Sequence, residues 1–311
     1  MDLRSLRYFL QIAGSGSLTR AAARLRVAQP SLTRHMHQLE EELGTPLFVR
    51  ASKGVSLTDA GVLLREHAER ILRDVEHVRG EIRARETVPR GTVALGMPPT
   101  LCPVLLPPLI ARMRAAYPSI ELDLRQAGSM ILPDWLAEGR IDAAVTTHLG
   151  RDRALTTLPL VREEMVLLQP PGSGGTGPVA AEELRHLALT MTQANLAITD
   201  ALLAPHGLEL CVDMVLNSLE TIRLMVQSGL CRTVLPYAVV QRDAEKGLIT
   251  ARRLLPGGLH RQLVLAFLIS RRIPPAVQAV CDLLRETVAE VEARDGFALP
   301  RPSRKRIAAI R

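Results

Sequence analysis

Segments typical of strands and of helices alternate along most of the chain, from Thr92 to Glu292. The expected strands are 92–97, 120–126, 141–146, 165–169, 188–192, 211–216, 233–235 and 263–269. The expected helices are 100–117, 129–138, 195–205, 218–227 and 275–292. A β-α-β-α-β order indicates a parallel sheet covered by helices. This region is therefore expected to be an α/β domain, and the 311-residue chain is long enough for two or three domains.

The first 58 residues show a different pattern, of short helices. Apolar residues at helical spacing predict a first helix up to Ala13, and Gly14-Ser-Gly-Ser17 ends it before a second helix. Gln29-Pro30 opens a third helix, with proline at its first position, where the missing N–H costs nothing. The expected buried stripe of the third helix is Leu32, Met36, Leu39 and Leu43. Residues 45–57 are predicted to form a small hairpin.

A long helix is predicted from Thr58 to Thr87. Its apolar residues step by three or four positions and are Ala60, Leu64, Ala68, Ile71, Val75, Val78 and Ile82. A lone helix with such a seam has to cover it, which favours a coiled-coil contact with a second copy of the chain. The alternative is that the seam packs on its own domain.

Charge is concentrated at the two ends of the chain. Residues 1–58 hold eight basic and four acidic residues, and residues 301–311 hold five basic and no acidic ones. The net charge is +7, and residues 59–300 contribute −2 to it. A basic terminal domain favours a polyanionic partner, with nucleic acid as the first candidate. The alternative is a basic surface without a partner.

Composition and motifs argue against several other classes. The longest apolar stretch, 101–113, is short and interrupted by prolines, and the N-terminus has no apolar signal core, so a cytoplasmic protein is expected. The four cysteines lack metal or framework spacing and are interpreted as reduced thiols. No nucleophile elbow, phosphate loop or dinucleotide glycine pattern is found. We therefore expect no enzyme activity, no cofactor and no metal site.

The second and third predicted helices form a helix-turn-helix, whose third helix would enter the major groove of DNA. At about 100° per residue, Arg34 lies nearly opposite the buried stripe. Arginine reads guanine or binds phosphate, and glutamine reads adenine. The predicted DNA-contacting residues are Gln29, Pro30, Ser31, Thr33, Arg34, His37 and Gln38 of this helix, with Arg50 and Lys53 of the hairpin. The alternative for these side chains is a solvated face.

The first 61 residues resemble the winged helix-turn-helix of LysR-type transcriptional regulators. The segments that carry this resemblance are Ser17–Leu25, Val27–Thr33, Leu39–Gly44, Leu47–Arg50 and Leu57–Gly61. Later segments are similar to the family's effector domain, namely Tyr117-Pro118, Glu121–Gly128, Leu136–Val145, Val226–Leu230 and Leu235-Pro236. Ala28 and Thr33 stand where the family usually has serine, and His35 and His37 are less common choices. These departures leave the DNA sequence that is read undetermined.

The resemblance implies a division of the chain into parts. They are a winged helix-turn-helix at 1–58, a linker and dimerisation helix at 59–88, an effector domain at 89–295 and a basic mobile tail at 296–311. The effector domain would be an α/β fold with two lobes, like periplasmic binding proteins. Lobe I would comprise 91–160 and 268–295, lobe II would comprise 161–267, and the crossovers would lie near Pro159–Gln169 and Leu263–Ile269.

Three helices are expected to begin just after strands, at Thr100, Ser129 and Asn217–Glu220. The free N–H groups of such helix starts suit a carboxylate or a similar anion. The resemblance implies effector contacts at Thr100, Ser129, Thr147 and Thr192, and Leu101 and Met130 would add apolar walls. The alternative is that the hydroxyls are plain helix caps and that the apolar side chains belong to the core.

The combined hypothesis is a LysR-type regulator that binds promoter DNA and responds to a small, anionic effector. The expected partners are double-stranded DNA, the effector and further copies of the chain in a dimer of dimers, with RNA polymerase as a further candidate. The resemblance favours activation over repression. A redox pair of Cys102 and Cys231 is an alternative mode of sensing. The rival classes are a DNA-architectural protein without sequence preference, a solute-binding protein and an enzyme.

Overall fold

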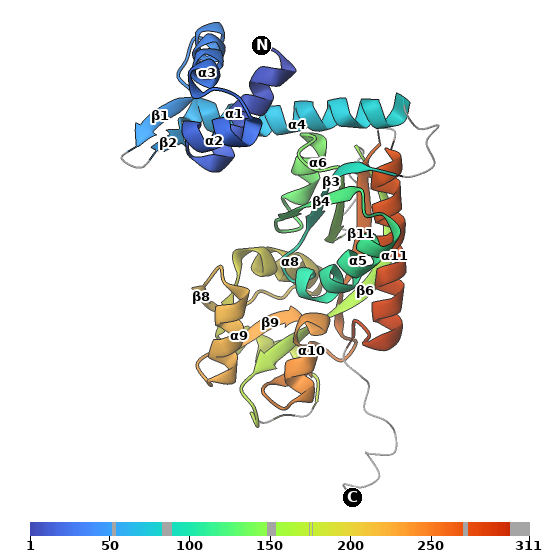
Figure 1. The fold of residues 1–311 in the computed structure, drawn as a ribbon. Coiled ribbons are helices and arrows are strands. Elements are labelled where there is room, and N and C mark those ends of the chain that lie inside the picture. The colour runs from blue at the N-terminus through green and yellow to red at the C-terminus, as the bar shows by residue number, and fades with distance from the viewer. Residues whose placement is uncertain are drawn as a thin grey trace, which may run out of the picture. The chain divides into compact units, whose positions relative to one another are not determined.

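The computed structural model describes residues 1–51, 54–82, 89–147, 154–173, 175, 177–269 and 273–298, and it divides into two compact units, 1–92 and 93–311 (Figure 1). Lys53, residues 83–88 of the predicted linker helix and residues 299–311 of the predicted tail lie outside the described residues, as does the side chain of Arg50. Within the described ranges, no helix is long and apolar enough to cross a membrane.

The first unit consists of three short helices, a hairpin and a long helix. These elements are α1 (Leu3–Ser15), α2 (Leu18–Leu25), α3 (Gln29–Leu43), β1 (Phe48–Ala51), β2 (Gly54–Leu57) and α4 (Asp59–Ile82). Side chains of Asp2 and Ser17 cap α1 and α2 by accepting from backbone N–H groups. Because α3 begins at Gln29, Pro30 is its second residue rather than its first, and its missing N–H still lies in the turn that makes no helical bond.

A single apolar core joins these helices. Its buried residues are Leu6, Phe9, Ile12, Ala21, Ala22, Leu32, Met36, Leu39, Leu47 and Ala68. Leu43 departs from the predicted stripe, because it is the last residue of α3 and is 40% exposed. The apolar seam of α4 divides into two parts. Its first part, from Ala60 to Ile71, packs on the core of its own unit, which is the alternative to a coiled-coil contact. Val78 in the second part is 54% exposed.

Gly61 in the first turn of α4 is expected to tolerate no side chain. A Cβ there would overlap the Leu47 carbonyl oxygen, whose position is set by a 3.0 Å hydrogen bond from the Thr58 N–H. Gly61→Ala should therefore lower the free energy of unfolding by more than about 1 kcal/mol. Gly14→Ala is the matched control, because its Cβ meets nothing within 4 Å in helix α1 and should stabilise the chain by about 0.5–1 kcal/mol. Urea denaturation measures both, and equal effects of the two substitutions would contradict the overlap.

The second unit contains a seven-stranded sheet and a separate pair of strands. The strands of the sheet are β3 (Gly91–Met97), β4 (Ile120–Gln126), β5 (Ala143–Thr147), β6 (Leu155–Gln169), β9 (Thr233–Pro236), β10 (Thr250–Arg253) and β11 (Leu259–Leu268). Their order is β10-β6-β11-β5-β3-β4, and β9 also pairs with β6. The separate pair is β7 (Leu189–Met191) with β8 (Val212–Val215), and these strands are parallel.

Seven α-helices of the described residues accompany these strands. They are α5 (Cys102–Ala116), α6 (Leu132–Ala137), α7 (Ala181–His186), α8 (Gln193–Leu203), α9 (Leu219–Gln227), α10 (Tyr237–Glu245) and α11 (Pro275–Arg294). A short 3₁₀ helix, η1 (Ala204–His206), follows α8. The sheet is mixed rather than parallel as predicted. β3 and β5 are parallel, but β11 is antiparallel to both β5 and β6, because the chain leaves one half of the sheet along β6 and returns along β11.

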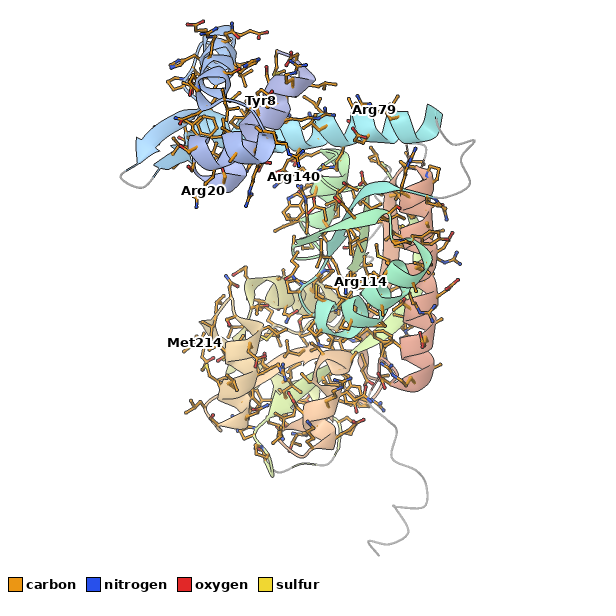
Figure 2. The ribbon with its side chains drawn as sticks, in the orientation of Figure 1. Tyr8, Arg20, Arg79, Arg114, Arg140 and Met214 are labelled. Atoms are coloured by element: carbon orange, nitrogen blue, oxygen red, sulfur yellow. The ribbon has the colours of Figure 1, made fainter. Side chains whose placement is uncertain are left out.

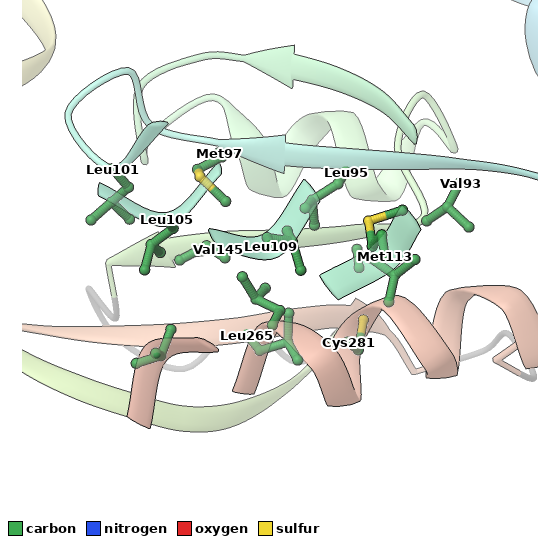
Figure 3. Packing of buried hydrophobic residues seen from close by; sticks show 14 of the residues in the cluster. Val93, Leu95, Met97, Leu101, Leu105, Leu109, Met113, Val145, Leu265 and Cys281 are labelled. Carbon is green, nitrogen blue, oxygen red and sulfur yellow. The ribbon is translucent and has the colours of Figure 1, made fainter. Parts of the chain in front are cut away.

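Two lobes follow from the cores that these long strands connect. The core of lobe I includes Val93, Leu95, Met97, Leu101, Leu105, Leu109, Met113, Val145, Leu265 and Cys281 (Figure 3). The core of lobe II includes Met165, Leu167, Leu189, Met191 and Leu259. Strands β6 and β11 run through both cores, and their pairing shifts register between Leu263 and Val264.

The structure moves two of the predicted boundaries. Residues 263–267 were assigned to lobe II, but Leu263 to Ala266 pair with β5 and three side chains of this stretch lie in the core of lobe I. The predicted tail began at 296, but Phe297 is buried in the core of lobe I and its carbonyl accepts the Glu164 N–H at 2.8 Å. Both differences come from contacts between residues far apart in the sequence.

Candidate functional site

The outer face of α3 carries most of the predicted DNA-contacting residues. Gln29, Pro30, Ser31, Arg34, His37 and Gln38 are exposed, and Thr33 is half-buried. The opposite face packs into the core through Leu32, Met36 and Leu39. The N-cap residue Ala28 makes no side-chain hydrogen bond, so the first turn of α3 is exposed without a side-chain cap. The free N–H groups of such a helix start can donate to a phosphate oxygen.

Hydrogen bonds within the unit orient several of these side chains. Thr33 Oγ1 donates to the Gln29 carbonyl at 3.0 Å, and Thr19 Oγ1 of α2 donates to Gln29 Oε1 at 3.4 Å. The bond from Thr19 uses the amide oxygen of Gln29, so the amide nitrogen can still donate to an acceptor atom of a DNA base. His35 packs edge-on against the ring of Tyr8 on α1, with ring centroids 5.3 Å apart. Tyr8 is labelled in Figure 2. His35, one of the departures from the family pattern, therefore has a packing role.

Glu40 holds the hairpin against α3, a role that the sequence analysis did not predict. Its Oε1 accepts from the backbone N–H groups of Leu47 at 2.7 Å and Phe48 at 3.2 Å. On the other side of the hairpin, the Val55 N–H donates to the Gly16 carbonyl at 3.0 Å. The hairpin that carries Arg50 is thus fixed relative to the outer face of α3.

The second unit contains a cavity of about 180 Å³ between its two lobes. Lobe I contributes Pro98, Pro99, Thr100, Gly128 and Ser129. Lobe II contributes Thr192, Ala194, Asn195, Ile198, Asn217 and Leu219. Arg261 of β11 completes the lining. Thr100, Ser129 and Thr192 are the three predicted effector residues that the structure brings together here.

Three predicted effector residues lie elsewhere. Leu101 is fully buried and points into the core of lobe I beside Leu105 (Figure 3). Met130 is 55% exposed and is not part of the cavity lining. Thr147 is buried behind Ser129, and its N–H donates to Ser129 Oγ at 3.2 Å. Thr147 therefore orients Ser129 rather than facing the cavity, whereas the other two side chains are turned away by the local course of the chain.

The most polar group of the cavity, Arg261, was missed. Its Nε donates to Glu163 Oε2 at 2.8 Å, its Nη2 lies 2.6 Å from the same oxygen in the ion pair, and Nη2 donates to Thr100 Oγ1 at 3.2 Å. Glu163 is completely buried, so burial raises the pKa of its carboxyl group, and the Arg261 guanidinium opposes that shift. The signal in the sequence was the alternation of Leu259, Arg261 and Leu263, which extends the predicted strand 263–269 toward the N-terminus.

The start of α8 forms the lobe II wall. Thr192 caps this helix by accepting the Asn195 N–H at 3.1 Å, and the Gln193 N–H donates to Asn217 Oδ1 at 3.0 Å. The side chain of Asn195 is 5% exposed, and its Nδ2 has no hydrogen-bond partner among the described residues. The wall thus contains a buried amide donor that nothing in the described chain satisfies.

Neither of the two cysteines proposed as a redox pair lines the cavity. Burial raises the pKa of Cys102 to about 11 and also raises that of Cys231, so both are thiols rather than reactive thiolates at neutral pH. No group of three or more histidine, cysteine, aspartate or glutamate residues suited to a metal ion occurs in the part of the chain that the structure describes.

Two family models match the chain, one for each unit. The bacterial regulatory helix-turn-helix protein model of the lysR family matches residues 3–62, and the LysR substrate binding domain model matches residues 86–289. The chain belongs to the LysR family. It is therefore a DNA-binding transcriptional regulator with an effector-binding domain, and its fold joins a helix-turn-helix unit to an α/β domain.

Known LysR proteins match nearly the whole chain. The nitrogen assimilation regulatory protein nac of Klebsiella aerogenes is 28% identical over 93% of this chain and 96% of its own length. The hydrogen peroxide-inducible genes activator of Pectobacterium carotovorum subsp. carotovorum is 31% identical over 79% of this chain and 83% of its own. A full-length OxyR variant from Pseudomonas aeruginosa superimposes with a TM-score of 0.68 at 26% identity, covering 96% of this chain and 99% of its own. CbnR in complex with its target DNA has a TM-score of 0.68 at 22% identity, covers 92% of this chain and 100% of its own, and shares the fold.

Proposed function

We propose that a small anionic effector binds the cavity between the lobes and changes how this LysR-type regulator occupies promoter DNA. The observation that carries the proposal is the lining, in which Thr100 and Ser129 of lobe I face Thr192 and Asn195 of lobe II, with Arg261 between them. A ligand that contacts both lobes binds most tightly at one spacing of the lobes. It therefore shifts the population of conformations, which is what a regulator requires.

The DNA-reading element in this proposal is the outer face of α3. Gln29, Pro30, Ser31, Thr33, Arg34, His37 and Gln38 would face the major groove, and Arg50 and Lys53 would contact the adjacent backbone or minor groove. Support comes from the exposure of the α3 side chains and from the bonds of Glu40, which fix the hairpin beside them.

The proposal includes a homodimer formed through α4. Val62, Leu63 and Val78 of this helix are exposed apolar side chains that the core of the unit does not cover. A symmetric dimer would place two α3 helices on paired half-sites, and a dimer of dimers would extend the contact. RNA polymerase remains a proposed partner, and the cytoplasm is where promoter binding would take place.

Affinity capture of sheared genomic DNA by the purified protein, followed by sequencing, tests the DNA-binding part of the proposal. We expect a few sharp peaks at promoters that share a dyad. Diffuse capture that falls steeply with salt would instead support the rival class of DNA-architectural proteins. Repeating the capture with an extract of small metabolites tests whether an effector changes the occupancy of those promoters.

Thr100→Val should weaken the effector response without changing DNA binding in the absence of effector. The substitution keeps the shape of the side chain but removes the hydroxyl group that accepts from Arg261 and faces the cavity. The loss of one hydrogen bond should shift the dose response of a captured promoter to the metabolite extract by about 3- to 10-fold. Thr287→Val is the matched control, because that hydroxyl group bonds within α11 and does not line the cavity. An unchanged dose response would remove Thr100 from the effector site.

A further inference from the structure

The two strands that connect the lobes share one charged rung. Along one face of β6, Val161 belongs to the core of lobe I and Met165 to the core of lobe II. Along β11, Leu263 and Leu259 belong to the same two cores. The residue between them is Glu163 on β6 and Arg261 on β11, and these two are direct partners in the antiparallel register. The apolar face is thus interrupted by an ion pair where the two cores meet.

Burying this ion pair costs desolvation free energy, so a contribution to stability does not explain why both charges are present. Glu163 is 0% exposed and Arg261 is 2% exposed, and apolar residues at such positions often stabilise a protein as well or better. Both nitrogens that bind Glu163 use the same oxygen, Oε2, and Oε1 has no partner among the described residues. Arg261 Nη1 takes part in no hydrogen bond to a described residue, while the side chain lines the cavity. A use in ligand binding accounts for the retained charge.

Asn195 lines the same cavity from the opposite lobe and carries a second unsatisfied donor. Its Nδ2 is buried without a partner in the described chain. Leaving such a group unpaired costs free energy that a ligand acceptor would recover. The other polar lining residues can all donate hydrogen bonds, and Arg261 is the charged one; they are Thr100, Ser129, Thr192, Asn217 and Arg261. This arrangement suits a group that only accepts, as a carboxylate does.

The rest of the cavity limits the size and charge of the ligand. The apolar lining consists of Pro98, Pro99, Ala194, Ile198 and Leu219. The volume of about 180 Å³ slightly exceeds the roughly 150 Å³ of a protein cavity that holds benzene. Arg261 is the one cation among the described lining residues and is shared with Glu163, so a second carboxylate on the ligand would have no cation to bind.

We propose that Arg261 and Asn195 are the specificity-determining residues of the effector cavity and that they select a compact monocarboxylate of about six to ten non-hydrogen atoms. Arg261 and Asn195 hold the carboxylate from β11 and from lobe II, and Thr100 contributes from lobe I. Glu163 is a positioning residue that orients Arg261. This inference rests on the proposed effector function of the cavity.

The test uses the full chain and matched pairs of probes that differ only in charge. The pairs are butyrate with butyramide, hexanoate with hexanamide, and benzoate with benzamide. The dicarboxylate phthalate is measured separately and compared with benzoate. Binding is measured by isothermal titration calorimetry up to 10 mM ligand. We expect at least one carboxylate to bind at least ten-fold more tightly than its amide and phthalate to bind more weakly than benzoate. Binding of no carboxylate, or equal binding of acid and amide, would overturn the proposal.

Variants identify the residues responsible. Asn195→Leu should weaken carboxylate binding about ten-fold, because it removes the unpaired donor. Glu163→Gln/Arg261→Gln replaces the ion pair by two amides that can still bond to each other, and should reduce the acid-over-amide preference to nearly one. Glu164→Gln/Arg253→Gln is the matched control. It neutralises a neighbouring pair, bonded at 2.5 Å, whose members do not line the cavity, and should leave the preference unchanged.

The outcomes separate this inference from the proposed function. If the promoter response to the metabolite extract depends on Thr100 but the preference for carboxylates survives Glu163→Gln/Arg261→Gln, the specificity assignment is wrong and the effector function stands. If carboxylates bind as expected but change the DNA occupancy of no promoter, the specificity assignment stands and the proposed function fails. A Glu163→Gln/Arg261→Gln variant that melts like the unaltered chain shows that lost binding is not lost folding.

Discussion

Arg261→Met should lower the free energy of unfolding by about 3–5 kcal/mol, because it leaves the completely buried Glu163 without its counter-charge. Methionine roughly keeps the volume of the arginine stem, so the loss reports on charge rather than on a cavity. Glu163→Met/Arg261→Met removes both charges and should recover most of the stability. Urea denaturation of the full chain, followed by circular dichroism, measures both variants.

The loss in Arg261→Met should depend on pH in a defined direction. Burial raises the pKa of Glu163 above its ordinary value of 4.5, and the substitution removes the guanidinium that opposes this shift. A group whose pKa is raised in the folded state contributes stability below its unfolded pKa, and this contribution is lost as the pH rises through the folded pKa. The variant should therefore be closest to the unaltered chain near pH 4 and weakest at neutral pH. A difference that does not change with pH would show that Glu163 is not the source of the loss.

Arg34→Ala should weaken specific DNA binding by roughly 1–3 kcal/mol, which is about 5- to 150-fold in the dissociation constant. Arg34 is exposed on the face of α3 opposite the core contacts of Leu32 and Met36, so the substitution should leave the fold intact. The dissociation constant is measured on a captured promoter fragment and on unrelated DNA at one salt concentration. A base contact predicts a larger loss on the promoter, whereas a phosphate contact predicts equal losses.

Arg114→Ala is the matched control for Arg34. Arg114 is an exposed arginine on α5 of the effector domain (Figure 2), so its substitution makes the same change in net charge outside the helix-turn-helix unit. It should change promoter binding by less than about 2-fold. If both variants bind the promoter equally well, α3 does not present Arg34 to DNA as proposed.

The helix-turn-helix unit was predictable from the sequence because its signals are local. Ser17 caps α2, and Gly16 and Gly44 end α1 and α3 in the left-handed conformation, so the helices end within two residues of their predicted limits. Strand β4 coincides with the prediction of 120–126, since apolar residues alternate there with charged ones and Pro118-Ser119 precedes them. The membership in the LysR family, predicted from ordered motifs, is confirmed by the two family models.

The connections between the lobes were not predictable in the same way. Local pattern predicted only 165–169 of β6, and the family resemblance extended this to Pro159. Residues 155–158 were missed because they are mostly exposed, and pairing with β11 rather than local preference makes them a strand. α7, α10 and β10 were also missed. The cavity residues Arg261 and Asn195 come from elements about 65 residues apart, and only the fold brings them together. Leu101 and Met130 were assigned to the cavity by their place after strands, which does not determine the direction of a side chain.

The direct pairing of Glu163 with Arg261 makes lobe II an insertion into lobe I. The chain leaves lobe I on one strand and re-enters it on the adjacent antiparallel strand, so the two ends of the insertion lie about 5 Å apart. A two-residue turn could join such ends as an ordinary β-hairpin. In modular terms, a different second lobe can be grafted at this point while lobe I and the helix-turn-helix unit keep their own connectivity. The ladder that carries Glu163 and Arg261 thus makes the second lobe an exchangeable part of the domain.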